Sequence, residues 1–182
     1  MSATLKDVLQ TKTKDELIDM YISLVEKPDD IYYELAITDP LTQVYNRRGA
    51  EAKFHELQIN DNLDDKKLVF VDLDHFKHIN DDMGHDWGDR ALYEAAKHLK
   101  NYFDDDIIIR FGGDEFLVIT NKSEDYINSF DKQTLSVNYQ DEDLIIKCSS
   151  GYSNYHDNIN LHDWIMEAEK CMFRNKHKRN LY

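Results

Sequence analysis

The amino-acid sequence predicts an α/β (α+β) fold, in which helices flank one mixed β-sheet and a short helical segment precedes them. Helix-like and strand-like patterns alternate from residue 40 onward, as is typical of this class. A continuous apolar run from Leu68 to Val71 has the pattern of a buried central strand. With 182 residues, of which 41% are hydrophobic, the chain can bury the core of one such domain and carry an appendage.

The N-terminal segment, residues 1–37, is predicted to be helical and distinct from a domain at residues 38–182. Two Thr–acid pairs with capping-box spacing predict short helices at residues 5–10 and 14–26. The pairs are Thr4 with Asp7 and Thr13 with Glu16. One face of the second helix is apolar and contains Leu17, Ile18, Tyr21, Leu24 and Val25. This face is expected to pack either on the same chain or on a second copy.

The elements of the domain follow in order. We predict a helix at residues 47–58, the central strand at residues 68–71, a helix at residues 88–101, and hairpins at residues 107–119 and 134–152. The helix at residues 88–101 is the clearest, because apolar residues recur at helical spacing: Ala91, Leu92, Ala95, Ala96, Leu99 and Phe103. A last amphipathic helix is indicated by Leu161, Trp164, Ile165, Ala168 and Met172. Trp87 and Trp164 are expected in the core.

The composition of the chain excludes several classes of function. A net charge of −14 argues against a nucleic-acid-binding protein, because contact with the phosphate backbone needs a basic surface. A small anionic ligand would need local cations or a metal. The sequence has neither an apolar run of membrane-spanning length nor a signal peptide, so a cytoplasmic protein is expected. Cys148 and Cys171 lack metal-ligand spacing and are interpreted as buried, reduced thiols.

The stretch RFGGDEFLVI, residues 110–119, places two glycines and two acids at the tip of a hairpin. Gly112 and Gly113 lack a Cβ atom, so they can adopt positive φ angles and let the backbone approach a ligand. Asp114 and Glu115 follow at the same tip. In an arbitrary protein the two glycines would serve only as a turn.

Two further stretches favour a site. In VFVDLDHFKHIND, residues 69–81, Asp72 and Asp74 end a buried strand, which is costly unless these carboxylates reach solvent or a cation. Asp72 beside Asp114 would form the small oxygen site that Mg²⁺ prefers. The stretch GHDWGD, residues 84–89, reads as a glycine-punctuated loop that leads into the strongest helix.

These stretches together resemble the GGDEF domain family of diguanylate cyclases. The matching blocks are DPLTQVYNRR at residues 39–48, DLDHFKHINDDMGHDWGD at 72–89, RFGGDEF at 110–116 and AEKCMFRNKHKRN at 168–180. The resemblance implies a sheet like that of nucleotidyl cyclases and polymerase palms. It also implies a reaction that joins two GTP into cyclic di-GMP and releases two pyrophosphates, between two domains that face each other.

The resemblance also implies residue roles. Asp72, Asp114, Glu115 and the Leu73 carbonyl would bind one or two Mg²⁺ (or Mn²⁺) ions, with Asp114 and Glu115 as the catalytic acids. Gly112 and Gly113 would let the phosphates approach. Asn80 and Asp89 match the guanine-reading positions, and a carboxylate accepts the N1–H and N2–H₂ donors of guanine but opposes adenine. Asp89 could instead be a charge at a helix N-terminus.

Further GTP contacts are implied for Phe76, Lys77, His85, Lys176 and Arg179. Lys77 could equally be a plain solubilising residue, and His85 is interpreted as loop structure or a wall of the base pocket. Lys176 and Arg179 match the family's phosphate-binding cations, although N-K-H-K-R lacks the family's glycine and is one residue shorter. The basic cluster of Arg174, Lys176, His177, Lys178 and Arg179 could also complement the helix dipole.

The sequence departs from many relatives at the inhibitory product site R-x-x-D. Phe103 occupies the arginine position while Asp106 keeps the aspartate. Without the cation that grips a product phosphate, product feedback through this site is expected to be absent. The segment from Asn121 to Thr134 is also short for the family.

The predicted function is an active, Mg²⁺-dependent diguanylate cyclase, because the metal, base and motif residues are all intact. Two alternatives remain open: a silent GTP-binding or partner-binding domain, and a cyclase for an adenine-containing dinucleotide, against which Asp89 argues. Catalysis would need a homodimer. The N-terminal helices organise it, or an upstream activating protein does, or the chain is a fragment. No nucleic-acid or membrane partner is expected.

Overall fold

The central strand β1 (Lys67–Leu73) forms where the apolar run predicts it, because its side chains are buried on both faces. The computed structural model describes residues 13, 28–60, 62–104, 106–130, 133–140, 142–156 and 159–179. The predicted helices at residues 5–10 and 14–26 and the apolar face of the second lie outside these described residues.

Five strands form one sheet in the order β2-β3-β1-β5-β4. The other strands are β2 (Ile107–Arg110), β3 (Glu115–Thr120), β4 (Thr134–Tyr139) and β5 (Glu142–Asn154). All four neighbouring pairs are antiparallel. The α+β class is therefore confirmed, but the prediction of a mixed sheet is wrong for the described strands. The only parallel pairing that they show is an isolated bridge between Tyr45 and Ile109.

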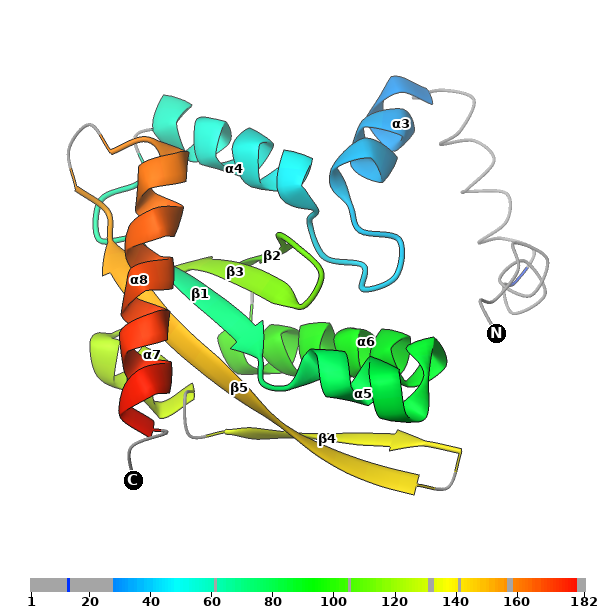
Figure 1. Cartoon of the computed structure of the whole chain (residues 1–182). Coiled ribbons are helices and arrows are strands. Elements are labelled where there is room, and N and C mark those ends of the chain that lie inside the picture. Colours follow the sequence, from blue (N-terminus) through cyan, green and yellow to red (C-terminus); the bar gives the residue numbers. More distant parts are fainter. Residues whose placement is uncertain are drawn as a thin grey trace. The chain divides into compact units, whose positions relative to one another are not determined.

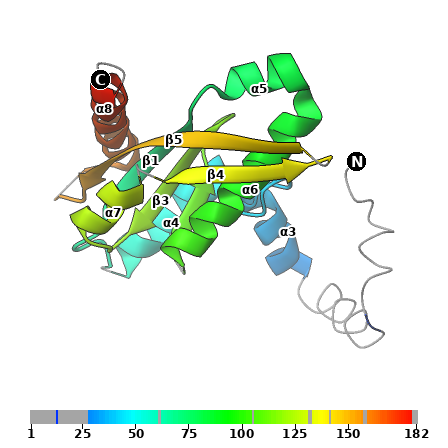
Figure 2. The same ribbon diagram turned by 90° about the horizontal axis from the view of Figure 1, so that it is seen from below.

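Helices cover both faces of this sheet (Figures 1 and 2). On one face lie α5 (Phe76–Met83), α6 (His85–Phe103) and α7 (Glu124–Phe130). On the other face lie α4 (Arg47–Ile59) and α8 (Leu161–Arg179). Alternate residues of each central strand therefore enter different cores. Val69 and Val71 pack towards α6, whereas Leu68 and Phe70 pack towards α4 and α8.

Trp87 and Trp164 are buried in these cores, as predicted. Cys148 is buried, whereas Cys171 on α8 is only half-buried, and neither forms a disulfide with a described residue.

Three helices were not predicted: α3 (Pro28–Ile37), α5 and α7. The interpretation of residues 84–89 as a loop is wrong, because α6 begins at His85. A single residue, Gly84 with φ of 92°, separates α5 from α6. A left-handed or near-left-handed φ is cheap for glycine, so one residue can redirect the chain between two helices.

The chain divides into two compact units, Met1–Ala36 and Ile37–Tyr182. The role assigned to the N-terminal segment stays a prediction. Within the described residues, every helix is too short or too polar to cross a lipid bilayer.

Candidate functional site

An acidic cluster forms where β1 and β3 end side by side. The antiparallel register sets Asp72 opposite Glu115, and the Leu73 N–H donates to the Asp114 carbonyl oxygen at 3.3 Å. Asp72, Asp114 and Glu115 are all half-buried. The structure thus brings together the three carboxylates that the sequence singled out, although Asp72 lies about forty residues before Asp114 and Glu115 in the chain.

Burial and neighbouring negative charges affect the ionisation of two carboxyl groups in this cluster. Burial, followed by the charge of Asp72, raises the pKa of Asp114 above its ordinary value. Burial, followed by the charges of Asp114 and Asp72, likewise raises the pKa of Glu115. Ionisation of Asp114 and Glu115 is therefore disfavoured, and a cation placed beside them would relieve the repulsion between the carboxylates.

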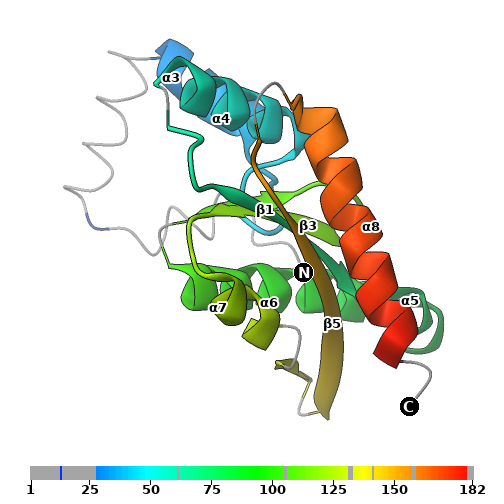
Figure 3. The same ribbon diagram turned by 90° about the vertical axis from the view of Figure 1, so that its left-hand side faces the viewer.

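One cation of the chain already reaches the cluster. Lys176, on α8, donates from Nζ to Asp72 Oδ1 at 2.5 Å and pairs with Asp74 Oδ1 at 3.0 Å. Burial alone would lower the pKa of Lys176, but its hydrogen bonds to Asp72 and Asp74 outweigh burial and raise it. The Ser149 hydroxyl also donates to Asp74 Oδ1, at 2.6 Å. Figure 3 shows α8 lying alongside β5.

The oxygen ligands of this cluster have the chemistry that a hard divalent cation such as Mg²⁺ prefers. Asp72, Asp114 and Glu115 offer only oxygen ligands, which Mg²⁺ prefers, and burial together with neighbouring carboxylates raises the pKa of Asp114 and of Glu115. In the described part of the chain, no group of three or more Asp, Glu, His or Cys side chains is placed so that it could hold a metal ion, so Asp72, Asp114 and Glu115 do not form a ready-made metal site. An open arrangement leaves coordination positions for water and phosphate oxygens.

The glycine turn works differently from the prediction. Neither Gly112 nor Gly113 has a positive φ. A Cβ atom on Gly112 would lie 2.2 Å from Glu115 Oε2, so a side chain there would displace the Glu115 carboxylate, whereas a Cβ atom on Gly113 would meet open space. The missing side chain of Gly112 thus leaves room for the Glu115 carboxylate at the turn.

Arg110 holds this turn, and the sequence reasoning assigned it no role. Its Nε and Nη2 donate to the Gly113 carbonyl at 3.2 and 3.0 Å, and its Nη1 donates to both oxygens of Asp39 at 3.2 and 3.3 Å. Tyr45 bridges to β2 and brings the preceding segment within reach of this strand. Both Arg110 and Asp39 lie in the sequence blocks that carry the family resemblance. Their position in these blocks was the feature of the sequence that could have pointed to them.

Asp39 is pre-organised for this contact. Burial would raise its pKa, but hydrogen bonds from the Thr42 side chain and backbone, together with Arg110, hold that pKa below its ordinary value. The carboxylate therefore stays ionised, and the Arg110 guanidinium is fixed between it and the turn.

The predicted guanine-reading residues lie around the junction of α5 and α6. Asn80 is half-buried, and its Oδ1 would lie 2.0 Å from a Cβ atom on Gly88, so glycine at this position makes room for the amide. Asp89 is exposed and lies in the second turn of α6, where Asp86 is the acid of the first turn. Its alternative role as a charge at the helix N-terminus is therefore wrong.

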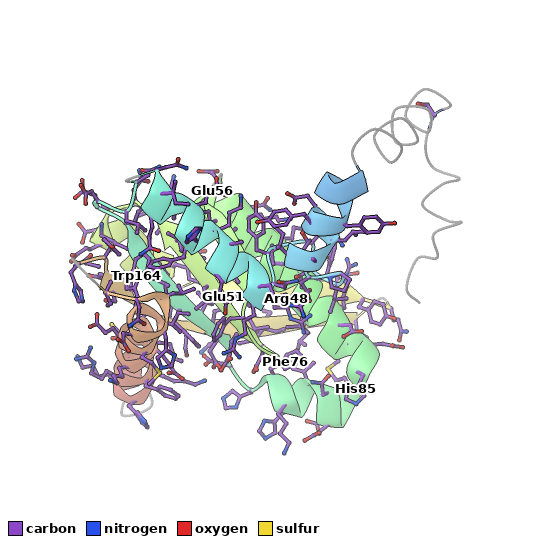
Figure 4. All side chains as sticks on the ribbon, turned by 90° about the horizontal axis from the view of Figure 1, so that it is seen from above. Arg48, Glu51, Glu56, Phe76, His85 and Trp164 are labelled. Atoms are coloured by element: carbon purple, nitrogen blue, oxygen red, sulfur yellow. The ribbon has the colours of Figure 1, made fainter. Side chains whose placement is uncertain are left out.

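The remaining predicted contacts are spread around the same region. Lys77 and His85 are exposed, and Phe76 is half-buried against the core. Figure 4 shows Phe76 at the start of α5 and His85 at the start of α6. Arg179 closes α8, but its side chain lies outside the described residues. Of the basic cluster on α8, only Lys176 contacts the acidic cluster among the described side chains.

The degenerate product site lies apart from the acidic cluster. Phe103 is fully buried in the core. Burial raises the pKa of Asp106, and its carboxylate accepts a hydrogen bond from Thr120 Oγ1 at 2.5 Å. The surface hollow here is also lined by Lys66, Lys100 and Lys122, of which Lys122 pairs with Asp104 at 3.4 Å.

Residues 36–181 match the family model described as Diguanylate cyclase, GGDEF domain. Among curated proteins, the chain is similar to Diguanylate cyclase DgcP of Pseudomonas aeruginosa, with 32% identity over 78% of this chain and 22% of DgcP. It is also similar to Response regulator PleD of Caulobacter vibrioides, with 37% identity over 65% of this chain and 25% of PleD. The chain thus spans about a quarter of the length of these two relatives.

Solved structures share the fold. Diguanylate cyclase SiaD of Pseudomonas aeruginosa, in complex with its activator SiaC, matches with a TM-score of 0.70 and 25% identity over 95% of this chain and 70% of SiaD. The coiled coil and GGDEF domain of DgcB from Caulobacter crescentus, in complex with c-di-GMP, matches with a TM-score of 0.70 over 91% of this chain and 94% of that chain. At 21% identity, the likeness to DgcB shows the fold alone.

Proposed function

The chain belongs to the GGDEF family of diguanylate cyclase domains, and from this premise we propose that it is an active diguanylate cyclase. It would join two GTP molecules into cyclic di-GMP and release two pyrophosphates. The observation that carries the proposal is the convergence of Asp72, Asp114 and Glu115 with Lys176 at the ends of β1 and β3. A domain that only packed or bound a partner would not need this costly concentration of charge.

The acidic cluster is proposed to hold Mg²⁺, or Mn²⁺ in its place. Asp72, Asp114 and Glu115 would bind the ion, and the Leu73 carbonyl would add a ligand. When bound, the ion supplies positive charge that offsets the phosphates and lowers the pKa of the attacking hydroxyl. Lys176 provides a second positive charge next to the cluster, where the β- and γ-phosphates of GTP would lie.

The reaction needs two copies of the domain. In each of two equivalent steps, the 3′-oxygen of one GTP forms a bond to the α-phosphorus of the other, and the bond from that phosphorus to the pyrophosphate breaks. The hydroxyl proton leaves to solvent. Because each domain would bind one GTP, a homodimer has to bring the two sites face to face. The N-terminal segment or an activating protein would promote this dimer.

Base recognition is proposed at the junction of α5 and α6. Along the edge of guanine, the Asn80 amide would donate and accept hydrogen bonds, and the Asp89 carboxylate would accept them. Asp89 offers only acceptors, which suit the N1–H and N2–H₂ donors of guanine and oppose the N1 acceptor of adenine. GTP is therefore the expected substrate. Phe76, Lys77 and His85 would border this site.

The test is incubation of the purified chain with Mg²⁺ and GTP, ATP or both, with products resolved by chromatography and mass spectrometry. We expect cyclic di-GMP from GTP alone, at a rate that rises faster than linearly with protein concentration. Binding of GTP without product would favour the silent domain or a requirement for an activator. An adenine-containing product would contradict the role of Asp89.

Arg110→Ala is expected to lower the cyclase kcat/KM by about tenfold. Without Arg110 the turn at Gly112 and Gly113 would shift slightly, and Asp114 and Glu115, which follow it, would no longer be aligned with the substrate. Arg110→Lys should recover only part of the activity, since an ammonium cannot bond Asp39 and the Gly113 carbonyl in the fork geometry of a guanidinium. Denaturant unfolding of each variant separates positioning from stability. Equal activity in the wild type and both variants would refute the positioning role.

We also propose that the product does not inhibit through the R-x-x-D site. Phe103 is buried, and the Asp106 carboxylate is already bonded to Thr120, so the arginine-type grip on a product phosphate is missing. Initial rates measured with added cyclic di-GMP should therefore be the same in the wild type and in Asp106→Ala. Inhibition that Asp106→Ala relieves would show that the nearby lysines replace the arginine.

A further inference from the structure

A cleft of about 570 Å³ lies between α5 and β5, and the proposed reaction assigns it no role. Its walls come from His75, His78 and Met83 on the α5 side and from Ile145 and Lys147 on β5. The predicted guanine-reading residues, Asn80 and Asp89, do not line it. Its volume falls within the range of small-molecule sites. Figure 2 shows α5 and the β4–β5 hairpin, from which these walls arise.

One wall of the cleft is apolar. Ile145 is 70% exposed although it lies within a strand, and Met83, which also lines the cleft, is half-buried. Ile79 and Ile146 line the cleft as well and are buried. An apolar floor with a small number of polar groups at the rim is the usual composition of a small-molecule site.

Two imidazoles stand at the rim. The rings of His75 and His78 are both exposed, with their centroids 5.6 Å apart at an angle of 66°. His75 adopts the left-handed conformation, with φ of 61°, and its side chain makes no capping hydrogen bond to α5. A non-glycine residue in this conformation is uncommon, and such residues occur often at ligand sites. The two rings offer surfaces on which a flat ligand can stack.

The charges of the cleft are only partly compensated. Lys176 and Asp74 are paired with each other at 3.0 Å. Lys147 and Asp82, in contrast, form no ion pair with any described residue. Lys147 can therefore accept an anion without first breaking a contact within the protein, and Asp82 can accept hydrogen bonds from ring N–H groups.

We propose that this cleft is a second small-molecule site, which binds a flat heteroaromatic ring joined to an anionic group. The ring lies between His78 and Ile145, and the anion contacts Lys147. Nucleoside monophosphates and aromatic carboxylates share this chemistry. Because Asp74 and Lys176 border both the cleft and the acidic cluster, an occupant also changes cyclase turnover. That consequence rests on the proposed function, whereas binding does not.

The experiment is a methyl NMR titration of the full chain, labelled with ¹³C at the isoleucine δ1 positions. AMP represents the nucleoside monophosphates, and indole-3-acetate represents the aromatic carboxylates. AMP is used instead of GMP because the substrate site is proposed to prefer guanine. Adenosine and succinate each lack one half of the proposed chemistry. AMP or indole-3-acetate should shift the methyl signals of Ile79, Ile145 and Ile146 saturably, at least tenfold more tightly than adenosine or succinate.

Matched variants localise the binding. Ile145 and Ile59 are both 70% exposed, so Ile145→Glu and Ile59→Glu carry the same change at equal exposure. Ile145→Glu should weaken binding at least tenfold, as should Lys147→Ala, and Ile59→Glu should leave it unchanged. The Ile59 methyl signal should not move during the titration.

Three outcomes would overturn the proposal. They are the absence of saturable shifts, shifts that persist in Ile145→Glu, and displacement of the probe by a slowly hydrolysed GTP analogue with Mg²⁺. The last outcome would assign the cleft to the substrate site. If the proposed cyclase function is wrong but the cleft proposal is right, the result is different: the methyl shifts remain while no cyclic di-GMP forms.

Discussion

Asp114→Ala is expected to reduce cyclic di-GMP formation by at least about a hundredfold, the scale on which a single preorganised charge contributes at an active site. Asp114 is one of the three carboxylates of the acidic cluster, so its loss removes a proposed metal ligand. The rate of product formation at saturating GTP and Mg²⁺ measures this effect. Asp64→Ala, which removes an exposed aspartate from the loop before β1, is the control.

Stability should move in the opposite direction. The pKa of Asp114 is raised in the folded chain, first by burial and then by Asp72, above its ordinary value of 3.8. A carboxyl with a raised pKa destabilises the fold above that pKa, and the penalty disappears below the ordinary value. At pH 7 the free energy of unfolding of Asp114→Ala should therefore equal or exceed that of the wild type. A variant that is less stable and also inactive would leave loss of fold as the explanation.

Replacing Asp114 by asparagine separates charge from shape. The amide would keep the side-chain volume but supply a neutral, weaker metal ligand, so Asp114→Asn should lose nearly as much activity as Asp114→Ala. Full activity in either variant would contradict the assignment of Asp114 to the metal site. A raised Mg²⁺ requirement with partial activity would instead show that Asp72 and Glu115 hold the ion between them.

Lys176→Met is expected to lower the kcat/KM for GTP by about ten- to a hundredfold. A hydrogen bond to a charged group contributes about 1.5 to 3 kcal/mol, and each 1.4 kcal/mol corresponds to a factor of about ten. Lys176 is the one described side chain of the C-terminal basic cluster that contacts the acidic residues, at 2.5 Å from Asp72 and 3.0 Å from Asp74. Methionine preserves most of the length and apolar surface of the lysine stem. Steady-state kinetics over a range of GTP concentrations measures the effect.

Lys170→Met is the matched control, because Lys170 is exposed on the same helix and forms no ion pair with the acidic cluster. It should retain wild-type kinetics. An unchanged kcat/KM in Lys176→Met would show that Lys176 is only a counter-ion for Asp72 and Asp74. In that case Lys77 or Arg179 would have to supply the positive charge for the phosphates.

The elements with long, regular apolar patterns were predictable from the sequence. The helix expected at residues 88–101 forms as His85–Phe103, and the strand expected at residues 68–71 forms as Lys67–Leu73. In contrast, α5 was missed because it has only 8 residues and is separated from α6 by Gly84 alone. The antiparallel sheet was also not predictable, because strand order and direction depend on contacts between distant segments.

The sequence by itself determined the family and the chemical character of the site, because glycines, acids and apolar runs at these spacings restrict local conformation and the ions that can bind. Only the tertiary structure decided which side chains meet. Arg110 reaches Asp39 across 71 residues, and Lys176 reaches Asp72 across 104. Such contacts depend on strand register and on how α8 packs over β5. Those features minimise the free energy of the whole core, and no short stretch of sequence encodes them.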